Sequence, residues 1–152
     1  NQKNRAGEIV ADINVKSSEL NGCELDEEMA KLMIDEFPIL SIAASQANSP
    51  SYFKGLDELR IKESDRLKLI NDNLNRCGYY SKIKDNDLFI DPTKNKQIIN
   101  SAIRTDFDHR IAMSFAVLGS KIGKLYINES ESISTSFPTF KEQFNNAGGN
   151  LS

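Results

Sequence analysis

The chain has 152 residues, enough for about one domain with a hydrophobic core of ordinary size. Its 39% hydrophobic and 27% charged residues are typical of a soluble globular protein, and no apolar run approaches the roughly 20 residues that span a bilayer. The net charge of -3 gives no reason to expect nucleic acid, because phosphate backbones bind clustered Lys and Arg. We therefore expect a soluble protein that binds neither membrane nor nucleic acid.

The first residues of the chain and its two cysteines indicate where in the cell the protein is found and whether it binds a metal. The segment Asn1–Arg5 has no initiator Met and no apolar signal-peptide core, which suggests a piece of a longer chain. Cys23 and Cys77 are too far apart for a zinc motif and favour two reduced thiols in a cytoplasmic protein. A single histidine, His109, excludes a multi-histidine site, so we expect no metal.

Glycine and proline divide the first half of the chain into alternating strands and helices. A polar-interspersed strand is predicted over Ile9–Val15. Phe37-Pro38 then begins a helix, because proline is tolerated in the first turn, and Ser49-Pro50 ends it. Its apolar residues at helical spacing are Phe37, Leu40, Ala44 and Ala47. A strand follows at Tyr52-Phe53 and turns at Gly55.

The next helix is predicted over about Glu63–Arg76, with Gly78 as its stop. One face of this helix is apolar: Leu67, Ile70, Leu74 and Cys77. Two short strands, Tyr79–Lys84 and Leu88–Ile90, flank the turn signal Asp85-Asn86-Asp87. The polar region Asp91–Arg104 is predicted to be a connection with one short strand at most.

A third helix is predicted over Asp108–Gly119, with Ile111, Phe115 and Leu118 on its apolar side, followed by a strand over Lys124–Asn128. Ser136 is expected to cap a last helix that carries Pro138 in its first turn. The apolar face of that helix is Phe140, Phe144 and Ala147. Gly148-Gly149 ends it, and a terminal strand is expected near Asn150.

The order of the predicted helices and strands repeats along the chain. Asp35, a helix, a strand, a helix and Cys77-Gly78 are echoed by Asp108, a helix, a strand, a helix and Ala147-Gly148. This echo predicts two copies of one unit in an α/β (α+β) fold with helices packed on sheets, although alternating proteins also produce such echoes by chance.

The densest charged cluster is Arg60-Ile61-Lys62-Glu63-Ser64-Asp65-Arg66, at a predicted helix start. The partial positive charge of a helix N-terminus disfavours cations there. If the helix includes both Lys62 and Arg66, they share one face that suits an anion with several oxygens. The alternative is a solvated charge run held by local ion pairs.

A second cluster, Asp106–Arg110, also lies at a helix start and contains His109. A lone histidine is more often structural than catalytic, whereas Arg110 is again a cation at the disfavoured end of a helix. Two such violations favour an anionic ligand. Asp35, before the helix at Phe37, is by itself an ordinary N-cap.

Four motifs, in this order, resemble the 5-enolpyruvylshikimate-3-phosphate (EPSP) synthase family: Met33–Leu40, Gly55–Arg66, Asp108–Phe115 and Thr135–Pro138. The resemblance covers nearly the whole chain. It implies a two-domain enzyme built from βαβαββ units with helices packed inside sheets. The chain would then be a single-domain fragment of the carboxy-terminal lobe, with units at about 7–91 and 92–152.

The resemblance also implies a reaction. The 5-hydroxyl of shikimate 3-phosphate adds to C2 of phosphoenolpyruvate while C3 takes up a proton, and loss of phosphate and a C3 proton then restores the enol ether. The missing amino-terminal lobe would supply much of the shikimate 3-phosphate site, so this chain alone is expected to be inactive. No cofactor and no metal are implied, and the full-length enzyme is expected to be a cytoplasmic monomer.

The family pattern assigns roles to particular residues. Asp35, Glu63 and Lys62 would be catalytic: Asp35 deprotonates the hydroxyl, Glu63 moves the proton at C3, and Lys62 bridges both substrates. The residues implied for phosphoenolpyruvate are Arg66, Arg110 and Lys62, and those for shikimate 3-phosphate are Asp35, Lys62 and, weakly, Glu58. Asp108, His109 and Thr135 would support the site.

Two positions depart from common members of the family. Many have a lysine before Thr-Phe-Pro, whereas this chain has Ser134-Thr135-Ser136-Phe137-Pro138, a form that resembles the glyphosate-insensitive class II branch. Glu58 stands where others have asparagine.

Two rival functions stay open: a UDP-N-acetylglucosamine enolpyruvyl transferase, whose family lacks the Lys62–Arg66 segment, and a non-catalytic anion-binding module, which would not need Asp35 and Glu63.

Overall fold

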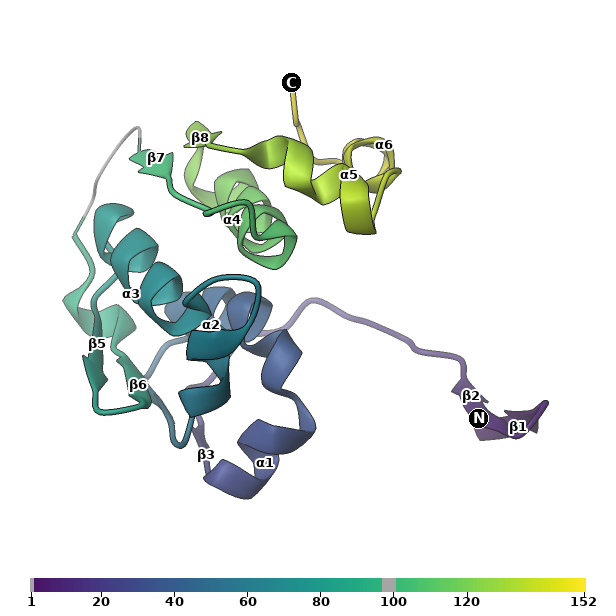
Figure 1. Ribbon diagram of the computed structural model, residues 1–152, viewed down its shortest axis with the longest axis horizontal. Coiled ribbons are helices and arrows are strands. Elements are labelled where there is room, and N and C mark those ends of the chain that lie inside the picture. Colours follow the sequence, from purple (N-terminus) through teal and green to yellow (C-terminus); the bar gives the residue numbers. More distant parts are fainter. Residues whose placement is uncertain (1, 97–100) are drawn as a thin grey trace.

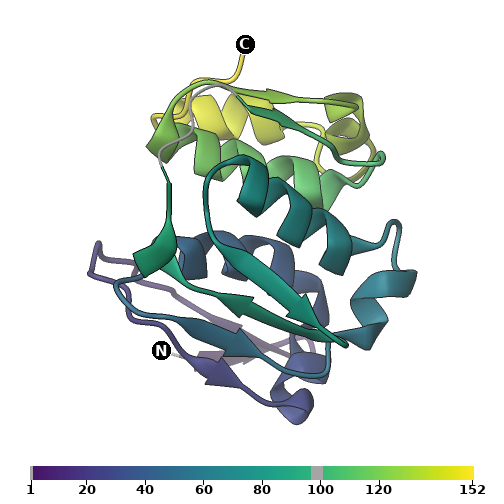
Figure 2. The same ribbon diagram turned by 90° about the vertical axis from the view of Figure 1, so that its left-hand side faces the viewer.

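Two sheets enclose the longer helices of the molecule (Figures 1 and 2). The computed structural model describes residues 2–96 and 101–152. One sheet consists of four strands, β3 (Glu24–Leu25), β4 (Ser51–Phe53), β5 (Ser81–Lys84) and β6 (Asp87–Ile90), and the other of β7 (Ser101–Ile103) and β8 (Leu125–Ile127). Between them lie α2 (Phe37–Ser45), α3 (Arg66–Arg76) and α4 (His109–Ile122). The predicted α/β class, with helices inside sheets, is confirmed.

The four-stranded sheet is built from the chain in the order β-α-β-α-β-β. β3 and β4 pair in parallel across a connection that contains α1 (Glu27–Leu32) and α2, as a parallel pair requires a crossover. β6 pairs antiparallel with both β4 and β5. The hairpin predicted between β5 and β6 is confirmed, and Asp85 takes the left-handed conformation in its turn (φ 56°).

The second half of the chain repeats only part of this order. β7 and β8 pair in parallel across α4, and two short helices follow, α5 (Ile133–Ser136) and α6 (Phe140–Asn146). The structure shows no strand over residues 147–152, so the strand predicted near Asn150 is wrong. The Asn145 side chain bonds both the N–H and the carbonyl of Leu151, which holds the chain against α6. The unit boundaries at 7–91 and 92–152 stay a prediction.

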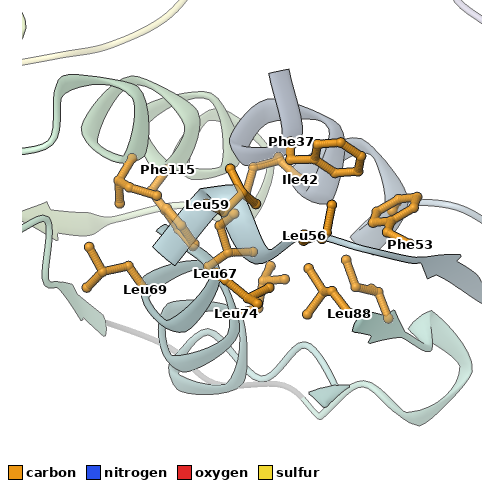
Figure 3. Packing of buried hydrophobic residues seen from close by; sticks show 14 of the residues in the cluster. Phe37, Ile42, Phe53, Leu56, Leu59, Leu67, Leu69, Leu74, Leu88 and Phe115 are labelled. Carbon is orange, nitrogen blue, oxygen red and sulfur yellow. The ribbon is translucent and has the colours of Figure 1, made fainter. Parts of the chain in front are cut away.

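The core lies where the three long helices meet the four-stranded sheet (Figure 3). Phe37 of α2 packs edge to face on Phe53 of β4, with ring centroids 5.3 Å apart. The apolar faces predicted for α3 and α4 are buried: Leu67, Ile70, Leu74, Cys77, Ile111, Phe115 and Leu118. This packing fixes the starts of α2, α3 and α4 relative to one another, since one cluster of side chains holds all three.

The region before β3 differs most from its prediction. The strand expected over Ile9–Val15 ends at Ala11, as β2 (Glu8–Ala11), and pairs with β1 (Gln2–Arg5) in a hairpin that lies apart from the rest of the chain in Figure 1. Residues 12–23 form no regular element. The helix α1 was not predicted, although Asp26 caps it by accepting a hydrogen bond from the Met29 N–H.

Several predicted helix boundaries are displaced, including the end of α4, which lies at Ile122 rather than at Gly119. α3 begins at Arg66 rather than near Glu63, because Asp65 is its N-cap and accepts a hydrogen bond from the Lys68 N–H. α2 ends at Ser45, before the predicted stop at Ser49-Pro50. Ser136 ends α5 instead of capping the last helix: the proline that follows Phe137 keeps that residue out of the helical region (φ -137°, ψ 75°), so α6 starts only at Phe140.

A search of the helices in the described ranges finds none long and apolar enough to cross a membrane.

Candidate active site

Arg66 is the centre of the candidate site. Its side chain is only 1% exposed, yet it is the first residue of α3, where a cation is disfavoured. Three carboxylates surround its guanidinium: Nε donates to Asp108 Oδ2 at 2.8 Å, Nη1 to Asp35 Oδ1 at 2.9 Å and Nη2 to Glu63 Oε2 at 2.5 Å. A buried arginine needs such partners, because an unpaired charge in the core is very costly.

Asp108 connects α3 to the start of α4. It is the N-cap of α4: its Oδ1 accepts from the N–H groups of Arg110 (3.0 Å) and Ile111 (3.4 Å). Its Oδ2 accepts from Arg66 and, at 2.9 Å, from the Ser64 hydroxyl. Burial alone raises the pKa of Asp108, but the hydrogen bond and charge of Arg66 outweigh it, so the pKa lies below its ordinary value. The buried side chain is therefore a carboxylate at neutral pH.

Asp35 brings the start of α2 to the same place. It lies in the short 3-10 helix η1 (Ile34–Glu36) directly before α2, and its Oδ1 meets Lys62 Nζ at 3.4 Å as well as Arg66. Partial burial raises its pKa, but the charges of Lys62, Arg110 and Arg66 outweigh that effect and lower the pKa overall. The Asp35 side chain is 45% exposed, so this ionised carboxylate is accessible to a ligand.

Arg110 joins the cluster from α4. Its Nη1 donates to the backbone carbonyl of Asp35 at 2.9 Å and to Glu36 Oε1 at 3.3 Å. The side chain is 35% exposed, in contrast to that of Arg66. The condition that Lys62 and Arg66 share one helical face is not met, since Lys62 precedes α3; the two cations meet through Asp35 instead.

The arrangement suits an anion with several oxygen atoms. The N-terminal ends of α2, α3 and α4 converge on it, and each brings the partial positive charge of a helix start. Its cations are Lys62, Arg66 and Arg110. Because Asp35, Glu63 and Asp108 already pair with Arg66, an anionic ligand must take some of that arginine's hydrogen bonds from Asp35 or Glu63, whose side chains are 45% and 50% exposed.

Three predicted site residues make no side-chain hydrogen bond or ion pair with this cluster within the described ranges. Glu58 is exposed on the 3-10 helix η2 (Asp57–Ile61). His109 is the first residue of α4 and is half-buried. Thr135 lies in α5 and donates to the Ser132 carbonyl at 2.7 Å. Their roles at the site stay predictions.

Several residues that shape the site could not be predicted from residue spacing. Ser64 bonds Asp108 from 44 positions away, and Glu36 bonds Arg110 from 74 positions away. Arg60, which belongs to the same charged cluster in the sequence as Lys62 and Arg66, bonds the β5–β6 turn. Each contact is made by long-range packing, which residue spacing does not encode.

Neither metal ligation nor a reactive thiol is indicated at this site. No group of three or more His, Cys, Asp and Glu side chains in the described part of the chain could hold a metal ion. Burial raises the pKa of the Cys77 thiol to about 11, so it is a protonated core residue at neutral pH.

The fold has known counterparts. A solved EPSP synthase from Acinetobacter baumannii superposes with a TM-score of 0.86 at 37% identity, covering 97% of this chain and 35% of that one. The enolpyruvyl transferase NikO from Streptomyces tendae superposes with a TM-score of 0.67 at 15% identity, over 89% of this chain. The chain thus has the fold of the enolpyruvyl transferases.

The sequence comparisons define the family within that fold class. The profile of EPSP synthase (3-phosphoshikimate 1-carboxyvinyltransferase) matches residues 5–144. A curated 3-phosphoshikimate 1-carboxyvinyltransferase from Paramagnetospirillum magneticum is 42% identical over 99% of this chain. The chain belongs to the EPSP synthase family. It spans about a third of the length of the curated relatives it matches, 34% in the case just given.

Proposed function

We propose that the full-length protein transfers the enolpyruvyl group of phosphoenolpyruvate to the 5-hydroxyl of shikimate 3-phosphate and releases phosphate. The observation that carries this proposal is the convergence of Asp35, Lys62, Glu63, Arg66 and Arg110 at three helix starts. Family membership supplies the reaction, and the cluster supplies the groups that the reaction needs: cations for phosphate and carboxylate, and acid–base groups beside them.

In the first step, the hydroxyl oxygen of shikimate 3-phosphate forms a bond to C2 of phosphoenolpyruvate. Asp35 accepts the hydroxyl proton, a role that its ionised and accessible carboxylate can fill. The proton that C3 takes up comes from Glu63 acting as a carboxylic acid, and Lys62 lies next to Asp35 where it can bind both substrates. In the second step, the C2–O bond to phosphate breaks, C3 returns a proton to the Glu63 carboxylate, and Asp35 passes the hydroxyl proton to the departing phosphate.

Arg66 and Arg110 bind phosphoenolpyruvate in this proposal. Their guanidinium groups match the paired oxygens of carboxylate and phosphate, and both lie at helix N-termini that favour anions. Glu58 would contact shikimate 3-phosphate weakly, and Asp108, His109 and Thr135 would support the site. No step calls for a metal or an organic cofactor.

The proposal extends to the organisation of the protein. The chain would form two units, at about 7–91 and 92–152, of the carboxy-terminal lobe, and the remainder of the protein would complete the shikimate 3-phosphate site. We further propose that the full-length enzyme is a cytoplasmic monomer.

The test is phosphate release by the purified full-length protein. We expect release only when both phosphoenolpyruvate and shikimate 3-phosphate are present. UDP-N-acetylglucosamine, the acceptor of the related transferases, should not replace shikimate 3-phosphate. Turnover with the UDP-sugar, or binding of both substrates without turnover, would each overturn the assignment, in favour of the related transferase or of a binding module.

A further inference from the structure

We propose that Arg60 is a positioning residue that fastens the segment carrying Lys62 and Glu63 to the β5–β6 turn. All three nitrogens of its guanidinium are engaged. Nε donates to Asn86 Oδ1 at 2.8 Å, Nη2 to the Asp85 carbonyl at 2.8 Å and Nη1 to Asp65 Oδ2 at 3.3 Å. The first two bonds lead to the hairpin turn, and the third leads to the N-cap of α3.

These contacts close a ring around four residues. Arg60 precedes the segment 61–64 and Asp65 follows it, so the bond between their side chains joins its two ends. The flanking side chains of Leu59 and Arg66 are buried, whereas Ile61 within the segment is 83% exposed. Polar contacts of Lys62, Glu63 and Ser64 tie the segment to the candidate site, and the bond from Arg60 to Asp65 joins its two ends.

The turn is itself fixed to the start of this region. The Leu56 N–H donates to the Asn86 carbonyl at 2.9 Å, and Leu56 is fully buried. The side chain and the carbonyl of Asn86 thus bind both Arg60 and the backbone four residues before it. The paired hairpin, bonded to the backbone at Leu56, is thus the reference point from which the segment is placed.

This role separates Arg60 from the anion-binding cations. Within the described residues, its guanidinium bonds the hairpin turn and the N-cap of α3, and none of the three carboxylates that meet Arg66. The inference rests on the proposed function, because it gives Arg60 the task of holding Lys62 and Glu63 at the position where they react. Misplacement of a reacting group by about 1 Å can cost roughly 100-fold in rate.

The expected signature is a loss of rate with little loss of stability. Arg60 and Asp65 side chains are 34% and 36% exposed, and ion pairs at such sites contribute little to folding. Arg60→Met in the full-length enzyme should lower kcat by about 10–100-fold. Arg60→Lys should not restore kcat, since an ammonium cannot bond three separated oxygens in a plane. Asn86→Ala, which removes the acceptor for Nε, should lower kcat in the same direction and combine non-additively with Arg60→Met.

The control is Arg76→Met, which removes an arginine at the opposite end of α3, where its Nη1 bonds the Ala102 carbonyl. This variant should keep wild-type kcat. A second readout needs no activity: amide hydrogen exchange over residues 57–65 should become faster in Arg60→Met and stay unchanged in Arg76→Met.

The outcomes are distinct. A rise in the KM for phosphoenolpyruvate alone, with normal kcat and exchange, would make Arg60 a substrate ligand and overturn the proposal. Wild-type kinetics in both Arg60→Met and Asn86→Ala would also overturn it. If Arg60→Met does not fold, Asn86→Ala decides the question. If the wild-type enzyme releases no phosphate, the proposed function fails, and the exchange measurement still decides whether Arg60 holds the segment.

Discussion

At the scale of single residues, the contact between Glu63 and Arg66 determines how proton transfer and substrate binding can be separated. Glu63→Gln keeps the size of the side chain but cannot exchange a proton, so kcat should fall by about 10²–10⁴-fold. The affinity for phosphoenolpyruvate should stay equal or improve, because a carboxylate that competes for Arg66 is gone. Steady-state kinetics with equilibrium binding measures both effects, and Glu142→Gln on exposed α6 is the control. Near-normal kcat would transfer the role to Lys62.

The contribution of the arginines to phosphoenolpyruvate binding is best measured by replacing Arg110. Removal of Arg66 would leave Asp108 buried without its charge partner, which destabilises proteins by about 3–5 kcal/mol. Arg110 is partly exposed and can be replaced more safely. Arg110→Met should raise the KM for phosphoenolpyruvate by about 10–150-fold, the equivalent of a charge-assisted hydrogen bond, and leave shikimate 3-phosphate binding largely intact.

At the scale of elements, Asp108 caps α4 and pairs with Arg66 through its two different oxygens. Asp108→Asn keeps the capping oxygen but loses the charge, whereas Asp108→Ala loses the cap as well, worth about 0.5–2 kcal/mol. The Tm of the full-length protein should therefore fall in the order wild type, Asn variant, Ala variant. Asp26→Asn, at the exposed cap of α1, is the control and should change Tm little.

The ion pair between Asp108 and Arg66 also predicts that the stability of the fold depends on pH. Because the pKa of Asp108 is lowered in the folded state, its stabilising effect is present above the unfolded value of about 4 and is lost as pH falls through the lowered folded pKa. The Tm difference between wild type and Asp108→Asn should thus shrink in acid. A difference that is the same at pH 7 and in acid would show that the charge of Asp108 does not stabilise the fold.

At the scale of the whole molecule, the cluster is assembled within this chain, but the chain is only about a third of its relatives' length. We expect the isolated chain 1–152 to fold cooperatively, because one core joins α2, α3, α4 and the four-stranded sheet. It should not turn over, since productive geometry requires both substrates to be held. Circular dichroism melting and phosphate release test the two statements. Release at enzyme-like rates by this chain would refute the need for the remainder.

Several features of the fold were predictable because their signals act over short stretches of the chain. Periodicity placed the buried faces of α3 and α4, proline placed the start of α2, and Asp108 was recognised before α4, because these signals act within a few residues. The family motifs named the cluster residues. Where local signals conflicted, the predicted boundary was wrong: the last helix was expected to start at Ser136, but with Pro138 in the chain it starts at Phe140.

The role of each charged side chain depends on contacts that form only in the folded protein. Arg60, Lys62 and Arg66 look alike in the sequence, yet one is bound to a hairpin turn, one is accessible beside Asp35, and one is buried among three carboxylates. The long-range partners that decide this lie 25 to 42 positions away from them, for example Asn86 from Arg60 and Asp108 from Arg66. Packing of three helix starts on one core brings them together, and no spacing along the chain records that contact.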